Sequence, residues 1–186
     1  MSKIITHLHI RAINACSSRG FLTIGSTSFL CRLGKTGRRF RKREGDGASP
    51  IGIFKLERLF YRPDKMLRPR INLNSRVLTK FDGWCDAPSS SAYNRLVQLP
   101  FSSSHEKLWR NDQCYDFVIS TNHNQRPRIR NFGSAIFLHV TDGKKGTEGC
   151  IALSEKHLRI VIARCSKNTR LVIWPSSGLP SAVLRK

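Results

Sequence analysis

Residues 133–162 read GSAIFLHVTDGKKGTEGCIALSEKHLRIVI, and this stretch decides the fold that we expect. The apolar run 135–140 contains His139 near its end and is typical of a buried strand. A short loop with glycines follows, and Gly149-Cys150 then opens a second apolar run. Such a loop can return the chain, so we expect His139 and Cys150 at one edge of a sheet.

The end of the same stretch predicts a helix. Ser154 is a good N-cap, and Glu155 suits the first helical turn. Apolar residues then repeat at i, i+3, i+4 and i+7, which is one face of a helix: Leu158, Val161, Ile162 and Cys165. We interpret Cys165 as a core thiol on that face.

The rest of the chain predicts a β-rich fold. Residues 4–13 alternate between polar and apolar, as in a half-buried strand, and the runs 21–24 and 29–33 flank Gly25-Ser26 as in a hairpin. Three long polar stretches, 34–50, 82–91 and the one that begins at 102, are predicted to be loops. Further strands are predicted at 51–56, 94–99, 116–121, 135–140 and 170–174.

Length and charge set outer limits. The 186 residues fit a single domain, with a core at about 20–175 and residues 176–186 as a loose tail. Lys and Arg number 33 against 12 Asp and Glu, a net charge of +21 that suits an anionic partner. Only 38–43 form a dense basic run, which we interpret as a solvated loop, with non-specific nucleic-acid binding as the other reading. No segment is long and apolar enough to span a membrane, and residues 1–11 do not resemble a secretion signal.

The cysteines give no sign of a metal site. Six are present without a CxxC pair, so a zinc finger or thioredoxin-like motif is unsupported. Cys85 and Cys114 lack an adjacent base and are interpreted as packing residues. His139 and Cys150 lack a third ligand at suitable spacing, and we therefore expect neither metal nor cofactor.

A Cys–His pair can carry out acyl transfer. An imidazole takes the thiol proton, the thiolate attacks a carbonyl, and the imidazolium protonates the leaving amine. Backbone N–H groups around Gly149 and Cys150 could stabilise the oxyanion. Taken alone, Gly-Cys after a His is a weak signal, because such a pair is usually a buried thiol near an unrelated imidazole.

Several ordered motifs resemble the YkuD-type L,D-transpeptidase family of the bacterial cell wall. The segment 136–139 with Thr147-Glu148-Gly149-Cys150 is similar to its His…[Ser/Thr]-x-Gly-Cys signature, and 45–54 is similar to its TPxGxF strand. Residues 82–86, 93–95, 104–110 and 115–116 fit one bacterial branch of the family. The resemblance covers roughly residues 20–175.

The resemblance implies a mostly β (β-rich α+β) fold, a mixed-sheet sandwich or barrel with a short helix after the catalytic cysteine. It implies Cys150 as nucleophile, His139 as proton donor and acceptor, Gly149 as a backbone oxyanion donor and the Val140 carbonyl as the group that orients His139. Substrate contacts are then expected from Thr147, Glu148 and Asn122. His123 could line the cleft, although we interpret it as a solvated loop histidine.

The implied reaction belongs to cell wall biogenesis and cell shape. Cys150 would attack the L-centre of diaminopimelate in a peptidoglycan tetrapeptide stem, release D-Ala and pass the acyl group to an amine, giving a 3→3 cross-link. Capture by water would make the chain an L,D-carboxypeptidase, and capture by a lysine of an envelope protein would anchor that protein. Location in the envelope or periplasm is implied, and nucleic acid is not expected as a partner.

The chain departs from the family pattern at three places. Glu148 replaces a common histidine, Ala152 replaces a polar residue, and the His-to-Cys loop is shorter than in many members. These departures bear on the acceptor and the substrate. The alternative from another class is a non-catalytic basic module of the same fold that binds an anionic polymer through 38–43.

Overall fold

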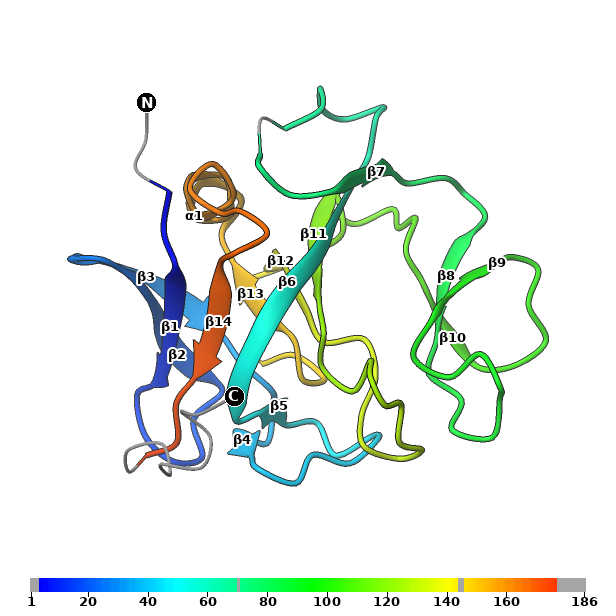
Figure 1. Ribbon diagram of the computed structural model, residues 1–186, viewed down its shortest axis with the longest axis horizontal. Coiled ribbons are helices and arrows are strands. Elements are labelled where there is room, and N and C mark those ends of the chain that lie inside the picture. The colour runs from blue at the N-terminus through cyan, green and yellow to red at the C-terminus, as the bar shows by residue number, and fades with distance from the viewer. Residues whose placement is uncertain (1–3, 70, 144–145, 177–186) are drawn as a thin grey trace.

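A computed structural model of the chain describes residues 4–69, 71–143 and 146–176. Its main sheet closes on itself, because the long strand β6 pairs on one side with β14 and on the other with β11 (Figure 1). The closed sheet follows the order β11-β12-β13-β3-β2-β1-β14-β6. Its strands are β1 (His7–Ala12), β2 (Arg19–Ile24), β3 (Thr27–Arg32), β6 (Gly52–Tyr61), β11 (Phe117–Thr121), β12 (Phe137–Val140), β13 (Ile151–Leu153) and β14 (Arg170–Ile173).

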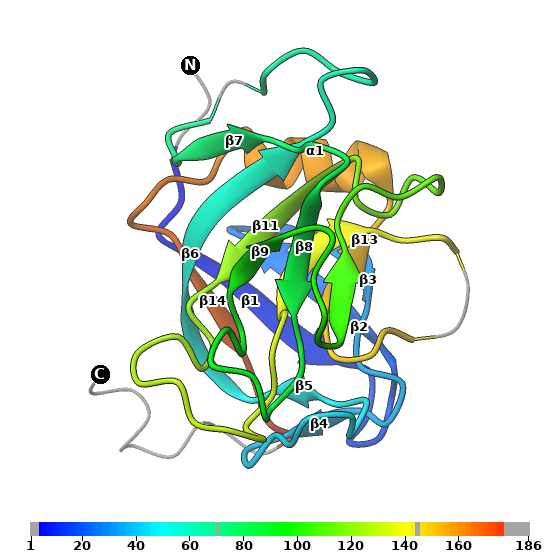
Figure 2. The same ribbon diagram turned by 90° about the vertical axis from the view of Figure 1, so that its right-hand side faces the viewer.

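Smaller elements surround this barrel. A three-stranded sheet with the order β10-β8-β9 stands beside it on the side of β11 (Figures 1 and 2), and β7 pairs with the outer edge of β6. A two-stranded sheet, β4-β5, lies in the segment that joins β3 to β6. The bounds are β4 (Arg38–Arg39), β5 (Ser49–Pro50), β7 (Ser75–Val77), β8 (Asp82–Cys85), β9 (Leu96–Gln98) and β10 (His105–Lys107).

One helix, α1 (Glu155–Ile162), lies across an end of the barrel and joins its core. The Ser154 side chain accepts a hydrogen bond from the His157 N–H and caps the first turn. Leu158, Val161 and Ile162 pack into the same apolar cluster as the inward side chains of β1, β2 and β3. In the described part of the chain, no helix is long and apolar enough to cross a membrane.

A second apolar cluster fills the space between the barrel and the three-stranded sheet. Trp84 of β8 meets Phe137 of β12 edge to face, with ring centroids 5.1 Å apart. Phe60 of β6 and Val118 of β11 belong to the same cluster, and so does Cys150. The smaller sheet therefore packs against the outer face of the barrel through this cluster, to which Cys150 belongs.

The predicted β-rich barrel with a short helix after Cys150 is confirmed, and so is the hairpin at Gly25-Ser26. Helix α1 ends at Ile162, so Cys165 lies beyond it, although its side chain is buried as expected. The loop predicted at 82–91 is wrong in its first part, because Asp82–Cys85 form the central strand of the small sheet. Residues 177–186 of the predicted tail lie outside the described residues.

The barrel core sets the stability of the fold, and strands β2 and β3 offer a matched test. Leu22 is 0% exposed and Leu30 is 42% exposed. We expect Leu22→Ala to lower the free energy of unfolding by about 2–5 kcal/mol, because a cavity remains in the core. Leu30→Ala should change it by no more than about 0.5 kcal/mol. Chemical denaturation of both variants checks this, and equal losses would contradict the barrel.

Candidate active site

The strands β12 and β13 pair in parallel and present His139 and Cys150 on one face. Their register pairs Leu138 with Ile151 and His139 with Ala152. Successive side chains of a strand point to opposite faces. Leu138 and Ile151 therefore fill the barrel, whereas His139 and Cys150, two positions before Ala152, point outward. Both outward side chains are only 8% exposed and line one pocket of about 430 Å³.

The Cys150 thiol is held by the backbone that leads into β12. Its Sγ donates a hydrogen bond to Ala135 O at 3.0 Å and accepts one from Phe137 N at 3.3 Å. Ala135 has φ +50°, a left-handed conformation that side chains other than glycine rarely adopt. The turn at this alanine thus aims its carbonyl group at the thiol. Among the described residues no hydrogen bond joins Cys150 to His139.

The His139 ring is fixed by its own strand and by an aromatic neighbour. Its Nδ1 lies 2.8 Å from Val140 O, and Tyr115 meets the ring edge to face at a centroid distance of 5.2 Å. Because a carbonyl oxygen only accepts, Nδ1 carries the proton in this contact. The lone pair is then on Nε2, which is the form that a general base requires.

Burial keeps both groups neutral. It lowers the pKa of His139 to about 4. Burial also raises the pKa of the Cys150 thiol far above its usual range, and the nearby Glu106 carboxylate raises it further. The sequence reasoning expected a thiolate held by an imidazolium. The shifted pKa values instead favour a protonated thiol and a neutral imidazole in one pocket.

The turn before Cys150 is tied together by Thr147. Its hydroxyl donates to Cys150 O at 2.6 Å and accepts from Gly149 N at 3.1 Å. The Gly149 N–H, predicted as an oxyanion donor, is therefore already bonded. The Cys150 N–H has no hydrogen-bond partner within the described ranges, and it is the backbone donor still available beside the thiol.

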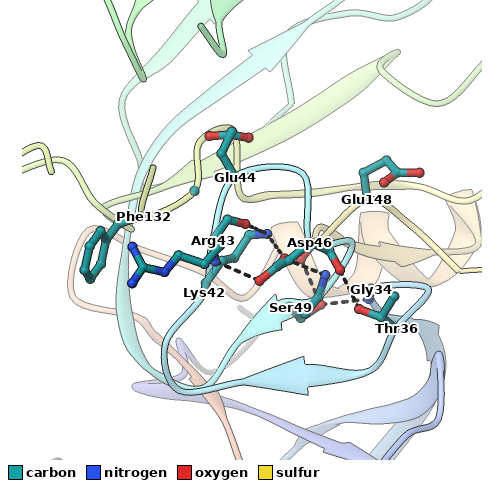
Figure 3. Close-up of polar contacts among 12 residues, drawn as sticks. Gly34, Thr36, Lys42, Arg43, Glu44, Asp46, Ser49, Phe132 and Glu148 are labelled. Atoms are coloured by element: carbon teal, nitrogen blue, oxygen red, sulfur yellow. Dashed lines mark hydrogen bonds and ion pairs between the residues drawn. The ribbon is translucent and has the colours of Figure 1, made fainter. Parts of the chain in front are cut away.

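Gly149 is required where it stands. Its φ is +144°, and a Cβ there would lie 2.9 Å from Ala48 O. The Gly149 carbonyl accepts a hydrogen bond from Ser49 Oγ at 2.8 Å. Ser49 Oγ in turn accepts a hydrogen bond from the Gly34 N–H (Figure 3). The segment 34–50 thus supports the turn that leads to Cys150.

Lys42 is a buried side chain within this supporting segment. The side chain is 3% exposed, and its Nζ lies 2.6 Å from Asp46 Oδ1 (Figure 3). A Cβ added to Gly133 or Gly149 would lie 2.9 or 3.2 Å from Lys42 Cε, so the lysine stem runs against both glycine turns. The prediction of a solvated basic run at 38–43 is therefore wrong at Lys42, because Asp46, four residues later, draws it inward.

The other predicted site residues are distributed as follows. Thr147 and Glu148 line the pocket with His139 and Cys150, and Glu148 also forms an ion pair with Lys35 at 2.6 Å. Asn122 is not among the described residues that line it. Its Oδ1 accepts instead from Lys55 N at 2.7 Å, which joins β6 to the end of β11.

His123 differs from expectation, whereas Cys85 and Cys114 are buried as predicted for packing residues. His123 is not a solvated loop residue, because its Nε2 contacts Phe132 O at 3.0 Å and its ring packs on Phe54. Cys85 is fully buried in the small sheet, whereas Cys114 lines the pocket. Sequence reasoning missed Glu44, Asp86 and Glu106 as pocket residues; no motif marks them, since they come from three separate segments.

The fold and the site together have the layout of a thiol-dependent acyl-transfer domain, with a cysteine and a histidine on neighbouring strands in one pocket. A family model for the L,D-transpeptidase catalytic domain (YkuD) matches residues 23–173. The chain therefore belongs to the YkuD family of L,D-transpeptidase catalytic domains, a family that acts on peptidoglycan and is generally associated with the cell envelope. A search of curated proteins gave no match.

The buried neutral His139 predicts an acid-sensitive fold. Its folded pKa of about 4 lies below the ordinary 6.5, so below pH 6.5 the unfolded chain binds more protons and stability falls as the pH falls. Between pH 7 and pH 5 this group should lower the free energy of unfolding by about 2 kcal/mol.

Denaturation of the wild type and of His139→Gln at both pH values isolates that contribution, because all other groups are shared. The wild type should lose about 2 kcal/mol more than the variant on acidification. An identical pH dependence for the two proteins would show that His139 is not buried in its neutral form.

Proposed function

We propose that this chain is a cysteine L,D-transpeptidase that acts on peptidoglycan tetrapeptide stems. The observation that carries the proposal is that Cys150 and a neutral His139 share one pocket in a chain of the YkuD family. The pocket volume of about 430 Å³ suits a peptide segment. The enzyme would work where its substrate lies, in the cell envelope.

The first half of the reaction forms a thioester. The thiol proton, held by Ala135 O in the resting site, passes to His139 Nε2 as sulfur attacks the carbonyl on the L-centre of diaminopimelate. The resulting oxyanion accepts from the Cys150 N–H. When the tetrahedral intermediate collapses, the bond to D-Ala breaks and His139 returns its proton to the departing amine.

The second half transfers the acyl group. An amine of another stem attacks the thioester, His139 takes its proton, and the cysteine leaves and is reprotonated, which completes a 3→3 cross-link. Water in place of the amine gives an L,D-carboxypeptidase, and a lysine of an envelope protein gives protein anchoring. All three outcomes share the same acyl-enzyme, so the proposal stands on its formation.

Arg32 is suited to hold a carboxylate of the stem. It lies opposite Ala152 in the register of β3 and β13, and both residues line the pocket. A guanidinium fork can bind a carboxylate through two parallel hydrogen bonds. Many family members have a polar residue at the position of Ala152. In this chain the neighbouring strand β3 supplies the polar group instead, through Arg32.

The alternative of a non-catalytic basic module is less well supported. It relied on the run 38–43, but Lys42 is committed to Asp46. Arg38 donates hydrogen bonds to Trp174 O and to Asn14 O. The run is therefore partly structural.

Incubation with purified tetrapeptide muropeptides, followed by mass spectrometry, tests the reaction class. We expect release of D-Ala with formation of dimers, and a covalent adduct with a carbapenem. Cys150→Ala should abolish both, and His139→Ala should slow turnover by about 10²–10⁴-fold because the general base is lost.

Cys16→Ala is the matched control, because Cys16 is exposed and lies outside the pocket. It should retain full activity. A folded wild-type protein that releases no D-Ala, or a Cys150→Ala variant that still forms dimers, would refute the proposal.

A further inference from the structure

Acidic residues are concentrated in the pocket of a strongly basic protein. The chain has 12 acidic residues against 33 Lys and Arg. Five of those 12 line the pocket, whereas the described Lys and Arg residues contribute only Arg32, Lys42 and Arg110. The acidic lining residues are Glu44, Asp86, Glu106, Asp142 and Glu148.

Three of these carboxylates form no ion pair with a described Lys or Arg: Glu44, Asp86 and Glu106. Glu148 is different, because Lys35 neutralises it. Two cations of the pocket are also committed, Lys42 to Asp46 and Arg110 to Asp112. We call Glu44, Asp86 and Glu106 the acidic wall.

The acidic wall is built from three segments and is held in place by tyrosines. Glu44 comes from the loop before β5, Asp86 follows β8, and Glu106 lies in β10. The Tyr93 hydroxyl donates a hydrogen bond to the Glu44 carboxylate, and the Tyr115 hydroxyl donates one to the Glu106 carboxylate. These bonds fix two carboxylates without neutralising them.

Two polar atoms of the pocket have no hydrogen-bond partner among the described residues. Asp86 Oδ1 is buried without a hydrogen bond, and so is Ser134 Oγ, in a residue that is 6% exposed and lines the same pocket. Burial raises the pKa of Glu106, the Tyr115 hydrogen bond and the Arg110 charge lower it, and the weaker effects of the Asp86 and Glu44 charges raise it again. Buried polar atoms without partners are rare in folded proteins, and both of these belong to residues that line the pocket of Cys150.

The residues that line the pocket restrict which kind of ligand could bind these polar atoms. Within the described ranges, no three His, Cys, Asp or Glu side chains gather closely enough to hold a metal ion. The carboxylates instead suit a group that presents several donors. A primary ammonium has three N–H donors and one positive charge, which matches acceptors spread over Asp86, Ser134 and a glutamate.

We propose that the acidic wall and Ser134 bind the free side-chain ammonium of diaminopimelate in the stem that acylates Cys150. This inference rests on the proposed function and adds a specificity subsite to it. Carboxylates stabilise the protonated amine, which is not a nucleophile. The bound amine therefore belongs to the acyl donor and not to the attacking acceptor.

Such a subsite would also prepare the nucleophile. The Glu106 charge is one cause of the raised pKa of the Cys150 thiol. A bound ammonium offsets that charge, so the correct substrate makes the thiol easier to deprotonate.

Binding to a Cys150→Ala protein tests the subsite without turnover. Calorimetric titration compares a diaminopimelate tetrapeptide with its 2-aminopimelate analogue, which lacks only the amine. We expect the amine-bearing peptide to bind at least about tenfold more tightly, the usual effect of one charge-assisted hydrogen bond. Adding Asp86→Asn should remove that preference and leave the analogue's affinity unchanged.

Two further variants separate the subsite from general effects. Ser134→Ala should reduce the preference several-fold, and it serves in place of Asp86→Asn should that variant fail to fold. Glu155→Gln, the same loss of one charge on the far helix α1, should preserve the preference.

Equal binding of the two peptides, absence of binding, or equal weakening of both by Asp86→Asn would overturn the inference. The proposed function fails separately, when the wild type releases no D-Ala from a tetrapeptide. A preference for the amine in a protein without turnover would support the subsite and refute only the reaction.

Discussion

The hydrogen bond from the Cys150 thiol to the Ala135 carbonyl is the contact around which the site is arranged. It requires the left-handed turn at Ala135, the parallel register of β12 with β13, and the Thr147 clamp on the cysteine turn. The buried Lys42–Asp46 pair supports the glycine turns on both sides. Removing one partner of such a buried pair typically lowers the free energy of unfolding by about 3–5 kcal/mol. Lys42 therefore stabilises the fold around the site.

The burial that orders the thiol also lowers its reactivity, because it raises the thiol pKa. The pKa of the Cys150 thiol is raised and that of His139 is lowered, so the proton stays on sulfur and the imidazole stays neutral. A neutral imidazole is a competent base, and a protonated thiol becomes a nucleophile only as its proton leaves. We therefore propose that the thiol is activated in the substrate complex, where the bound ammonium would offset the Glu106 charge.

Sequence patterns predicted the local features of the fold and of the site. The apolar run ending at His139, the Gly149-Cys150 turn and the capped helix are contiguous signals, and each corresponds to an observed element. Strand β8 was missed because Asp82-Gly83-Trp84-Cys85 has no polar–apolar alternation, and all four residues are buried. The burial of Lys42 and the interstrand role of Asn122 depend on tertiary contacts. The acidic wall was likewise invisible, since its members lie far apart in the sequence.

The protonation state of His139 in the free enzyme tests this account most directly. Nitrogen-15 NMR of the labelled histidine rings, assigned with His139→Gln, reports charge and tautomer at pH 7. We predict a neutral ring protonated on Nδ1, with Nε2 unprotonated, as the contact with Val140 O requires. A doubly protonated ring at pH 7 would reveal a preformed thiolate–imidazolium pair and would contradict the account.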